Sequence, residues 1–599
     1  MFKKFKEDLF ADPQSAASLI RRLFAENATA HWRAYALVLS MMAIIAASTA
    51  TAAYLIGRAV NDAYVAKNFS AVLIVCGSII VVSAVKGLAS YFQAIGLARI
   101  SNRIIAENQR ALCEKLLQQN LSFFADRHSS EFSARVTWGA RAASDTINTL
   151  LTGAGRDALL LLGLMTVMVI QSPVLSLLSV VVMPLAVLAS RGAIKRVRDI
   201  AKTEFGAGTD ILESLQETVQ GYKIVEAFNL HGVMRNRMTA NISTIEKVSN
   251  KLSKAMNFSS PLMEALGGVA VAGVMLLGGY QTIVLGGSPG EYVSFIAAFL
   301  LAYEPAKRLT RMNLELSNSL AGVRILFEFL DLPDRSDRNN KADLAMSGGR
   351  IEFKTVEFGY RPTVPVLRGA SFLAEPGKLT ALVGPSGGGK STIFNLLLRL
   401  YDGYSGSIQV DGNEISSVSR ALLRDHFAFV GQDAFLFRGT IRDNIALGLK
   451  DATERDIFAA AEAAHADEFI SQFPLGYDTQ VGEHGMQLSG GQRQRISVAR
   501  ALIRRASIIL LDEPTSFLDS ETEKYVNMAV SKLFKDKTRL VIAHRLNTVT
   551  HADIIHVIED GRIVESGTHD TLLNEGQRYA HFFKLQLVEP KDALVSQAS

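Results

Sequence analysis

The sequence predicts an α-helical polytopic membrane domain of six spans with long intracellular helices, followed by an α/β domain built on a phosphate-binding loop (P-loop). Long apolar runs fill the first half of the 599-residue chain and stop near residue 310. From about residue 350, short apolar runs alternate with amphipathic segments, as in α/β domains. Two domains also agree with the length, because one hydrophobic core rarely organises so many residues.

The composition excludes several classes of protein. Hydrophobic residues make up 48% of the chain, which rules out a disordered polypeptide. The 63 basic and 58 acidic residues leave a net charge of only +5. This charge is too small to indicate nucleic acid as a partner, so membrane lipids are the expected surroundings. The two cysteines, Cys76 and Cys113, cannot build a disulfide framework and are expected to be reduced thiols.

Six apolar segments approach the roughly 20 residues that a helix needs to cross a bilayer. They cover about 34–57, 71–96, 156–172, 174–190, 259–284 and 291–309. The junction at Gln171, Ser172 and Pro173 is so short that it predicts a helical hairpin between the third and fourth spans. The stretches between spans two and three, and between spans four and five, contain almost no Gly or Pro, so their helices should continue beyond the bilayer.

Basic residues indicate the orientation of the spans, because lysine and arginine are in excess on cytoplasmic flanks. They gather before the first span, after the second and after the fourth, which places both termini in the cytoplasm. Residues 16–27 predict an amphipathic elbow helix along the inner membrane surface, and a soluble helix packed on a neighbour is the alternative. The expected domains are 1–33 (cytoplasmic N-terminus with the elbow helix), 34–330 (six spans), 331–349 (linker) and 350–599 (α/β domain with a C-terminal tail).

The run GPSGGGKST fits the P-loop pattern G-x-x-x-x-G-K-[ST]. Its glycines let backbone N–H groups turn inward around phosphate oxygens, and the helix that follows directs its positive end at them. Lys390 should reach the terminal phosphates, and Ser391 should bind magnesium. The predicted phosphate site comprises Gly384, Pro385, Ser386, Gly387, Gly388, Gly389, Lys390, Ser391 and Thr392. An unrelated Gly-rich turn is disfavoured by the strand before the loop and the helix after it.

The run IILLDEPTS supplies the second part of this site. Its apolar residues predict a buried strand that brings Asp512 to its end, where a carboxylate can hold magnesium. Glu513 comes next and is expected to act as the general base that polarises the attacking water. With the P-loop, this pair predicts a site that binds ATP and Mg²⁺ and hydrolyses the nucleotide.

The run LSGGQ, followed by RQRISVARAL, resembles the signature of the ATP-binding cassette family. Its residues are Leu488, Ser489, Gly490, Gly491 and Gln492. The resemblance implies further roles for residues of about 350–585: Tyr360 stacks on adenine, Gln432 is the Q-loop glutamine and a magnesium ligand, His544 is the switch histidine, and Asp519 is the D-loop aspartate. Phe517 stands where alanine is common in that loop.

Six spans ahead of one cassette resemble the bacterial exporter half-transporters, a group with lipid A flippases and multidrug exporters. In that group the signature loop of one cassette completes the ATP site of another. One P-loop and one signature therefore imply a second identical chain with two equivalent ATP sites, and a heterodimer stays open. The resemblance also implies a multi-pass protein of the bacterial inner membrane, with its cassette in the cytoplasm, that works by ATP-driven alternating access.

Ionisable residues within the spans bear on the cargo, because they are costly there and usually functional. Lys86 and Arg156 match basic cavity residues of the lipid A flippases, and Glu304 stands at their third basic position. Alternatively, Lys86 snorkels or pairs with Asp157 or Glu264. A small amphiphilic substrate is expected: a lipid, a lipid-linked glycan or a hydrophobic drug. A peptide or thiol-conjugate exporter of the same architecture and an ATP-gated regulator or channel are the alternatives.

Overall fold

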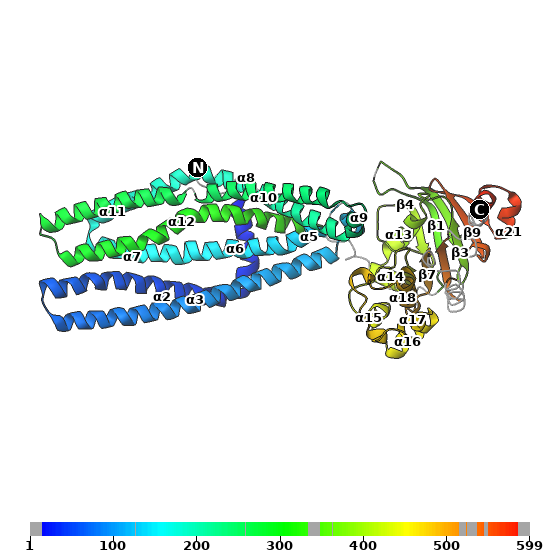
Figure 1. The fold of residues 1–599 in the computed structure, drawn as a ribbon, viewed down its shortest axis with the longest axis horizontal. Coiled ribbons are helices and arrows are strands. Elements are labelled where there is room, and N and C mark those ends of the chain that lie inside the picture. The colour runs from blue at the N-terminus through cyan, green and yellow to red at the C-terminus, as the bar shows by residue number, and fades with distance from the viewer. Residues whose placement is uncertain are drawn as a thin grey trace. The chain divides into compact units, whose positions relative to one another are not determined.

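The computed structural model describes residues 15–584 except 126, 128, 258, 285, 334–347, 362, 514–522, 524–535 and 544–548. The chain divides into two compact units (Figure 1). The first comprises Met1–Gln119 and Asp126–Asp334, and the second comprises Asn120–Ala125 and Arg335–Ser599. The short helix α4 (Leu121–Ala125) thus groups with the second unit although the sequence places it between two membrane-domain helices.

The first unit is helical throughout its described elements. Its elements are α2 (Ala16–Val60), η1 (Asn61–Val65), α3 (Phe69–Leu117), α5 (Ser129–Ala134), η2 (Arg135–Gly139), α6 (Ala140–Leu150), η3 (Leu151–Asp157), α7 (Ala158–Gln171), α8 (Pro173–Gln220), α9 (Tyr222–Ala227), α10 (His231–Asn257), α11 (Ser259–Ile283) and α12 (Pro289–Leu330). The elements η1, η2 and η3 are π-helical turns. Figure 1 shows the long helices lying side by side.

Three helical stretches among the described residues are long and apolar enough to cross a membrane: His31–Val65, Phe69–Leu117 and Glu131–Gln171. Gly267–Ile283 is a shorter apolar helix. The predicted hairpin is confirmed, because Ser172 is extended between α7 and α8, with φ −157°. The prediction of helices that continue beyond the bilayer is also confirmed. At about 1.5 Å per residue, the 49 residues of α3 span roughly 70 Å, more than twice a hydrocarbon core of about 30 Å.

The predicted elbow helix and the first span form two arms of one helix, α2, which bends at His31 (φ −128°, ψ 23°). The apolar side chains of the first arm are buried in protein, with Leu19 and Leu23 only 4% and 0% exposed. Arg22 donates two hydrogen bonds of 2.7 Å to Asp331, just beyond α12. This arm is therefore packed on a neighbouring helix, and its position along the inner membrane surface stays a prediction.

The second unit contains two sheets. The four-stranded antiparallel sheet has the order β2 (Leu367–Ala374), β1 (Ile351–Phe358), β4 (Ser405–Val410), β5 (Asn413–Glu414). The six-stranded sheet has the order β10 (Arg562–Gly567), β9 (Ile554–Glu559), β3 (Leu379–Val383), β8 (Thr538–Ile542), β7 (Ile508–Asp512), β6 (Phe427–Val430). Its strands run parallel except β10, which pairs antiparallel with β9.

Helices accompany these sheets in the α/β pattern that the sequence predicts. They are α13 (Lys390–Leu397), α14 (Arg420–Asp425), α15 (Ile441–Ala446), α16 (Glu454–Ala463), α17 (Asp467–Ile470), α18 (Gly490–Leu502) and α21 (His569–Glu575), with short 3-10 turns at Ile415–Ser417, Gly476–Asp478 and Glu483–Gly485. Strands β3, β6, β7 and β8 are almost wholly buried, as in parallel sheets covered on both faces. Parallel strands end at the same edge, so the segments after β3, β6 and β7 meet there.

Candidate functional site

The P-loop lies where the sequence predicts it, between β3 and α13. Gly384, Gly387 and Gly389 have φ values of 149°, 81° and 101°, which side-chain-bearing residues rarely adopt. A Cβ at Gly384 would overlap the carbonyl oxygen of Ile558 on the neighbouring strand. Pro385, Ser386 and Gly387 are exposed, whereas Gly388, Gly389 and Lys390 are buried. The loop is therefore a tight backbone turn that leads into the N-terminus of α13. Lys390, Ser391 and Thr392 are the first residues of this helix, and anions bind well at such a helix end.

Lys390 extends over this loop with its side chain largely buried. Its Nζ donates hydrogen bonds to the carbonyl oxygens of Gly384 (2.8 Å) and Pro385 (2.9 Å). Burial lowers the pKa of the Lys390 ammonium, while the nearby carboxylates of Glu513 and Asp512 oppose this effect. The positive charge is thus held inside the ring of the loop, next to both acids predicted to take part in hydrolysis.

Asp512 and Ser391 meet at the end of β7, as the magnesium prediction requires. The Asp512 carboxylate accepts a hydrogen bond from the Ser391 side chain. Burial and then the charge of Glu513 raise the pKa of Asp512, and the Ser391 hydrogen bond and Lys390 lower it. A hydroxyl, a carboxylate and the Gln432 amide oxygen are hard oxygen ligands of the kind that Mg²⁺ takes together with nucleotide phosphates. The residues present therefore fit the ion.

Glu513 and Gln432 are brought together from positions 81 residues apart. Gln432 Nε2 donates a hydrogen bond of 3.1 Å to Glu513 Oε2. Glu513 has φ 48°, a left-handed conformation that is uncommon for a residue with a side chain and is concentrated at functional sites. This conformation turns the residue out of the strand that ends at Asp512. Gln432 thus holds the carboxylate that the sequence predicts to be the base.

Tyr360 lies beside α13 with a side chain that is fixed by its hydroxyl group. The hydroxyl is 3.0 Å from Thr392 Oγ1 and accepts a hydrogen bond of 2.9 Å from Asn395 Nδ2. The ring packs edge-on against Tyr401 at 4.9 Å between centroids, yet 46% of the residue stays exposed. A fixed, half-exposed ring near the P-loop suits base stacking, which stays a prediction.

The LSGGQ segment begins helix α18. Ser489 Oγ accepts a hydrogen bond from the backbone of Gln492, whose side chain accepts one from the backbone of Ser489 (2.8 Å). This capping box fixes the start of the helix, with Gly490 and Gly491 in its first turn and Leu488 buried before it. Among the described residues, no hydrogen bond joins this segment to the P-loop. The site residues His544 and Asp519, together with Phe517, lie outside the described residues.

In the membrane domain, the sequence prediction missed Arg308 on α12. Arg308 donates hydrogen bonds from Nε (2.9 Å) and Nη2 (3.1 Å) to the carboxylate of Asp157, which also receives one from Arg156 Nε (3.1 Å). Glu304 lies 4.0 Å from Arg308 Nη1, one turn earlier on the same helix. The one signal in the sequence was the charge of Arg308 at the inner end of the sixth predicted span. The sequence did not indicate its partner Asp157, because the two residues are 151 positions apart.

The proposed pairing of Lys86 with Asp157 or Glu264 is wrong. Asp157 pairs with the two arginines, and Glu264 accepts a hydrogen bond of 3.2 Å from Lys307. Among the described residues, Lys86 on α3 has no acidic partner. Each acid therefore has a cation from α12, which leaves Lys86 available for another role.

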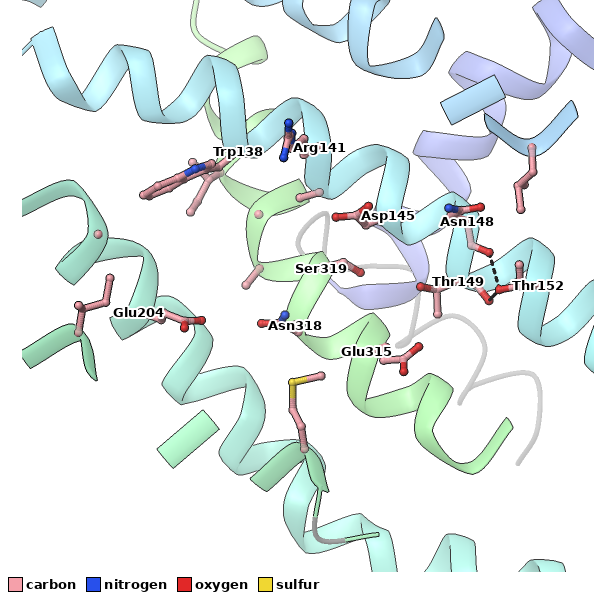
Figure 2. Close-up of a pocket in the computed structure, with 18 residues that line it drawn as sticks. Trp138, Arg141, Asp145, Asn148, Thr149, Thr152, Glu204, Glu315, Asn318 and Ser319 are labelled. Atoms are coloured by element: carbon pink, nitrogen blue, oxygen red, sulfur yellow. Dashed lines mark hydrogen bonds between the residues drawn. The ribbon is translucent and has the colours of Figure 1, made fainter. Parts of the chain in front are cut away.

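A cavity of about 710 Å³ lies in the first unit between α6, α8, α10 and α12 (Figure 2). Its lining includes Trp138, Arg141 and Asp145 on the α6 side and Glu315 and Asn318 on α12, all drawn in Figure 2. None of Lys86, Arg156 and Glu304 lines it. The predicted cargo residues thus lie outside this cavity, whose walls combine apolar side chains with charged side chains of both signs.

Two family comparisons cover both units. Residues 35–305 match the family described as the ABC transporter transmembrane region, and residues 367–516 match the family described as ABC transporter. The first match covers the helical unit, and the second runs from β2 to just beyond Glu513. The order of the two matches is the domain order that the sequence predicts.

Several curated proteins are similar over nearly their whole length. An uncharacterized ABC transporter ATP-binding protein of Sinorhizobium fredii is 44% identical over 96% of this chain and 98% of its own. The ATP-dependent lipid A-core flippase of Syntrophus aciditrophicus is 38% identical over 94% of this chain and 93% of its own, and that of Vibrio cholerae is 35% identical over 84% and 87%. A solved bacterial Atm1-family ABC exporter with ATP bound superposes with a TM-score of 0.85, at 26% identity, over 93% of this chain and 99% of its own.

Proposed function

The chain belongs to the ATP-binding cassette (ABC) transporter family as an exporter half-transporter with one membrane domain and one cassette, and we propose that it flips or exports an anionic amphiphile across the bacterial inner membrane. The observation that carries this proposal is the assembly of Lys390, Ser391, Asp512, Glu513 and Gln432 at one edge of the cassette sheet. The relatives named lipid A-core flippases support an amphiphilic cargo.

Different residues of the cassette contribute to different parts of ATP hydrolysis. Backbone N–H groups of the P-loop and α13 bind the phosphates, and Lys390 turns from its carbonyl partners to the terminal phosphates. Ser391, Asp512 and Gln432 would hold Mg²⁺, which neutralises charge that develops on the phosphates. Glu513 orients the attacking water and accepts its proton, and the hydrogen bond from Gln432 fixes the carboxylate for this step.

A homodimer completes each ATP site in this proposal. The N-terminus of α18, with Ser489 as its cap, is a second phosphate-binding helix end that makes no hydrogen bond to the P-loop among the described residues of one chain. Two chains that exchange their signature segments bury two nucleotides between their cassettes. ATP binding then closes the cassettes and turns the membrane domains outward, and hydrolysis resets them.

The assembly is tested by disulfide trapping between Ser489→Cys and Ser386→Cys, in a chain whose Cys76 and Cys113 are replaced by Ser. With ATP and an oxidant, non-reducing electrophoresis should show a covalent dimer, because the two thiols meet across the nucleotide. Each single-cysteine variant is the control. Cross-linking that stays within one chain would refute the proposed exchange.

The charged residues of the membrane domain lead to a second prediction. A cation in an apolar span costs about 2.5–3.5 kcal/mol on insertion scales unless it faces water or a partner. Lys86 has no acidic partner among the described residues and is expected to face the cargo. Arg156 offers only Nε to Asp157 and is expected to face the cargo with its other N–H donors. Replacing both by Ala should remove the stimulation of ATPase by anionic lipid in nanodiscs while leaving basal ATPase near that of the parent. Glu304 is expected to disfavour heavily phosphorylated headgroups. An unchanged response would give both cations a structural role and favour a multidrug exporter.

One screen distinguishes the alternative functions, because each function predicts that a different class of compound stimulates ATPase most. ATPase of the protein in nanodiscs is measured with lipid extracts, anionic glycolipids, hydrophobic cations, peptides and thiol conjugates. Greatest stimulation by anionic lipids supports the proposal, whereas peptides or thiol conjugates in first place would replace it. An ATP-gated channel is disfavoured because the hydrolytic residues are assembled, with Gln432 bonded to Glu513.

A further inference from the structure

Asp157 is a buried acid that two arginines contact. The residue is 1% exposed, and it accepts hydrogen bonds from both Arg156 and Arg308. The buried carboxylate can neutralise only one of the two guanidiniums in this cluster of Arg156, Asp157 and Arg308. The second negative charge nearby is that of the exposed Glu304, 4.0 Å from Arg308 Nη1. The buried part of the cluster therefore holds two guanidiniums on one carboxylate, and the charge of Glu304 balances them from the surface.

The two arginines also keep hydrogen-bond donors that Asp157 does not use. A guanidinium has five N–H donors, and Arg156 offers only Nε to Asp157. Arg308 offers Nε and Nη2, and its Nη1 lies 4.0 Å from the exposed Glu304, which is too far for a hydrogen bond. The side chains of Arg156 and Arg308 are 27% and 44% exposed. Unused donors of both arginines therefore reach the surface of the unit.

The backbone around the cluster is shaped to bring α12 against the third predicted span. Arg156 and Asp157 lie in the π-helical turn η3, and such turns are rare and frequent at functional sites. Gly153 in the same turn leaves room for Met312 of α12, because a Cβ there would overlap the methionine sulfur. This close approach places Arg308, one turn before Met312, within reach of Asp157.

The cluster also lies near one end of the cavity shown in Figure 2. Thr152 lines that cavity and precedes Arg156 by four residues, and Glu315 lines it and follows Arg308 by seven residues. Spacings of four and seven return to the same face of a helix. The faces that line the cavity therefore continue to the two arginines.

We propose that Arg308 is a specificity-determining residue that binds the anionic headgroup of the cargo together with Arg156, and that Asp157 is the positioning residue that orients both guanidiniums. The preferred ligand is a phosphate or carboxylate group on an amphiphile, because two guanidiniums bind such planar or tetrahedral oxyanions through paired N–H groups. This inference rests on the proposed function and assigns to Arg308 a role that the sequence did not indicate.

The test measures ATPase of the full-length protein in phosphatidylcholine nanodiscs with increasing fractions of phosphatidylglycerol. For Arg308→Gln, we expect the half-saturating fraction of phosphatidylglycerol to rise about tenfold or more, the effect of losing a hydrogen bond to a charged group. Arg308→Lys should fall between this variant and the parent. Arg103→Gln is the matched control, because Arg103 pairs with Glu107 on α3, outside the cluster.

Asp157→Asn separates positioning from charge by the sign of its effect. The substitution adds one positive charge to the cluster, so a purely electrostatic role predicts a lower half-saturating fraction. A positioning role predicts a higher one, because an NH2 donor replaces one of the two oxygens that accept hydrogen bonds from the guanidiniums. We expect the fraction to rise, and a fall would overturn the role given to Asp157.

Each remaining outcome also decides the inference. If the parent does not respond to phosphatidylglycerol, the proposed anionic cargo fails and this inference fails with it. In a second case, the parent responds to phosphatidylglycerol and the Lys86 and Arg156 double variant does not. If Arg308→Gln then has the same half-saturating fraction as the parent, this inference is overturned and the proposed function is kept. Arg308→Gln and Asp157→Asn could both lose basal ATPase, and Arg308→Lys then decides because it keeps the ion pair with Asp157. A half-saturating fraction of phosphatidylglycerol equal to that of the parent in Arg308→Lys would overturn the proposal.

Discussion

Glu513→Gln is expected to bind ATP as the parent does and to hydrolyse it about 10²–10⁴-fold more slowly, the usual range for loss of a general base. The substitution removes the proton acceptor but keeps the shape of the side chain. Its amide oxygen can still accept the hydrogen bond that Gln432 donates to Glu513. The P-loop contacts of Lys390 and the Ser391–Asp512 hydrogen bond are left in place.

Two measurements check this prediction: phosphate release under saturating ATP, and ATP affinity from a fluorescent nucleotide competed by ATP. Glu575→Gln, on the exposed end of α21 in the same cassette, is the control and should match the parent in both. The variant should also accumulate the ATP-dependent disulfide dimer, because hydrolysis no longer separates the cassettes. A Glu513→Gln protein that turns over near the parental rate would remove Glu513 from the role of base.

Lys390→Ala is expected to weaken ATP binding about 10–100-fold, because a hydrogen-bonded charge beside the phosphates contributes about 1.5–3 kcal/mol. The effect differs in kind from that of Glu513→Gln, since affinity itself is lost. The ammonium is buried, and it donates to the carbonyl oxygens of Gly384 and Pro385, so its removal also loosens the loop.

Fluorescent-nucleotide titration and the melting temperature without nucleotide separate these two consequences. Lys378→Ala is the matched control, because Lys378 lies on the same domain, exposed, and pairs with Glu375. A melting temperature near that of the parent with reduced affinity would confirm a direct contact with the phosphates. Parental affinity in Lys390→Ala would contradict the assignment.

The cassette was predictable because its chemistry depends on local sequence. The P-loop needs glycines at positions whose φ is positive, and Gly384, Gly387 and Gly389 provide them within six residues. The strands that end in Val383, Val430 and Asp512 are short apolar runs. Parallel pairing then brings their ends to one edge, where Gln432 donates a hydrogen bond to Glu513.

The membrane domain was predictable only in outline. Length and apolarity indicate the spans, and the extended Ser172 confirms the tight turn expected from Gln171 to Pro173. The bend at His31 falls between the predicted elbow helix and the first predicted span, although residues 16–60 show no proline or glycine near it. The role of Glu304 at the third basic position of the flippases stays a prediction, and the structure adds that Glu304 lies 4.0 Å from Arg308.

The sequence by itself determined the family and the order of the two domains. It also predicted the residues of the nucleotide site, because these depend on short motifs whose glycines, lysine and acids act within one strand–loop–helix unit. Only the tertiary structure decided which charges in the spans are paired. Asp157 meets Arg308 across 151 positions because α12 packs against the π-helical turn at Gly153, and helix packing of this kind leaves no periodic signal in the sequence. The sharing of Asp157 by two guanidiniums, and with it the proposed selection of an anionic headgroup, follows from that packing.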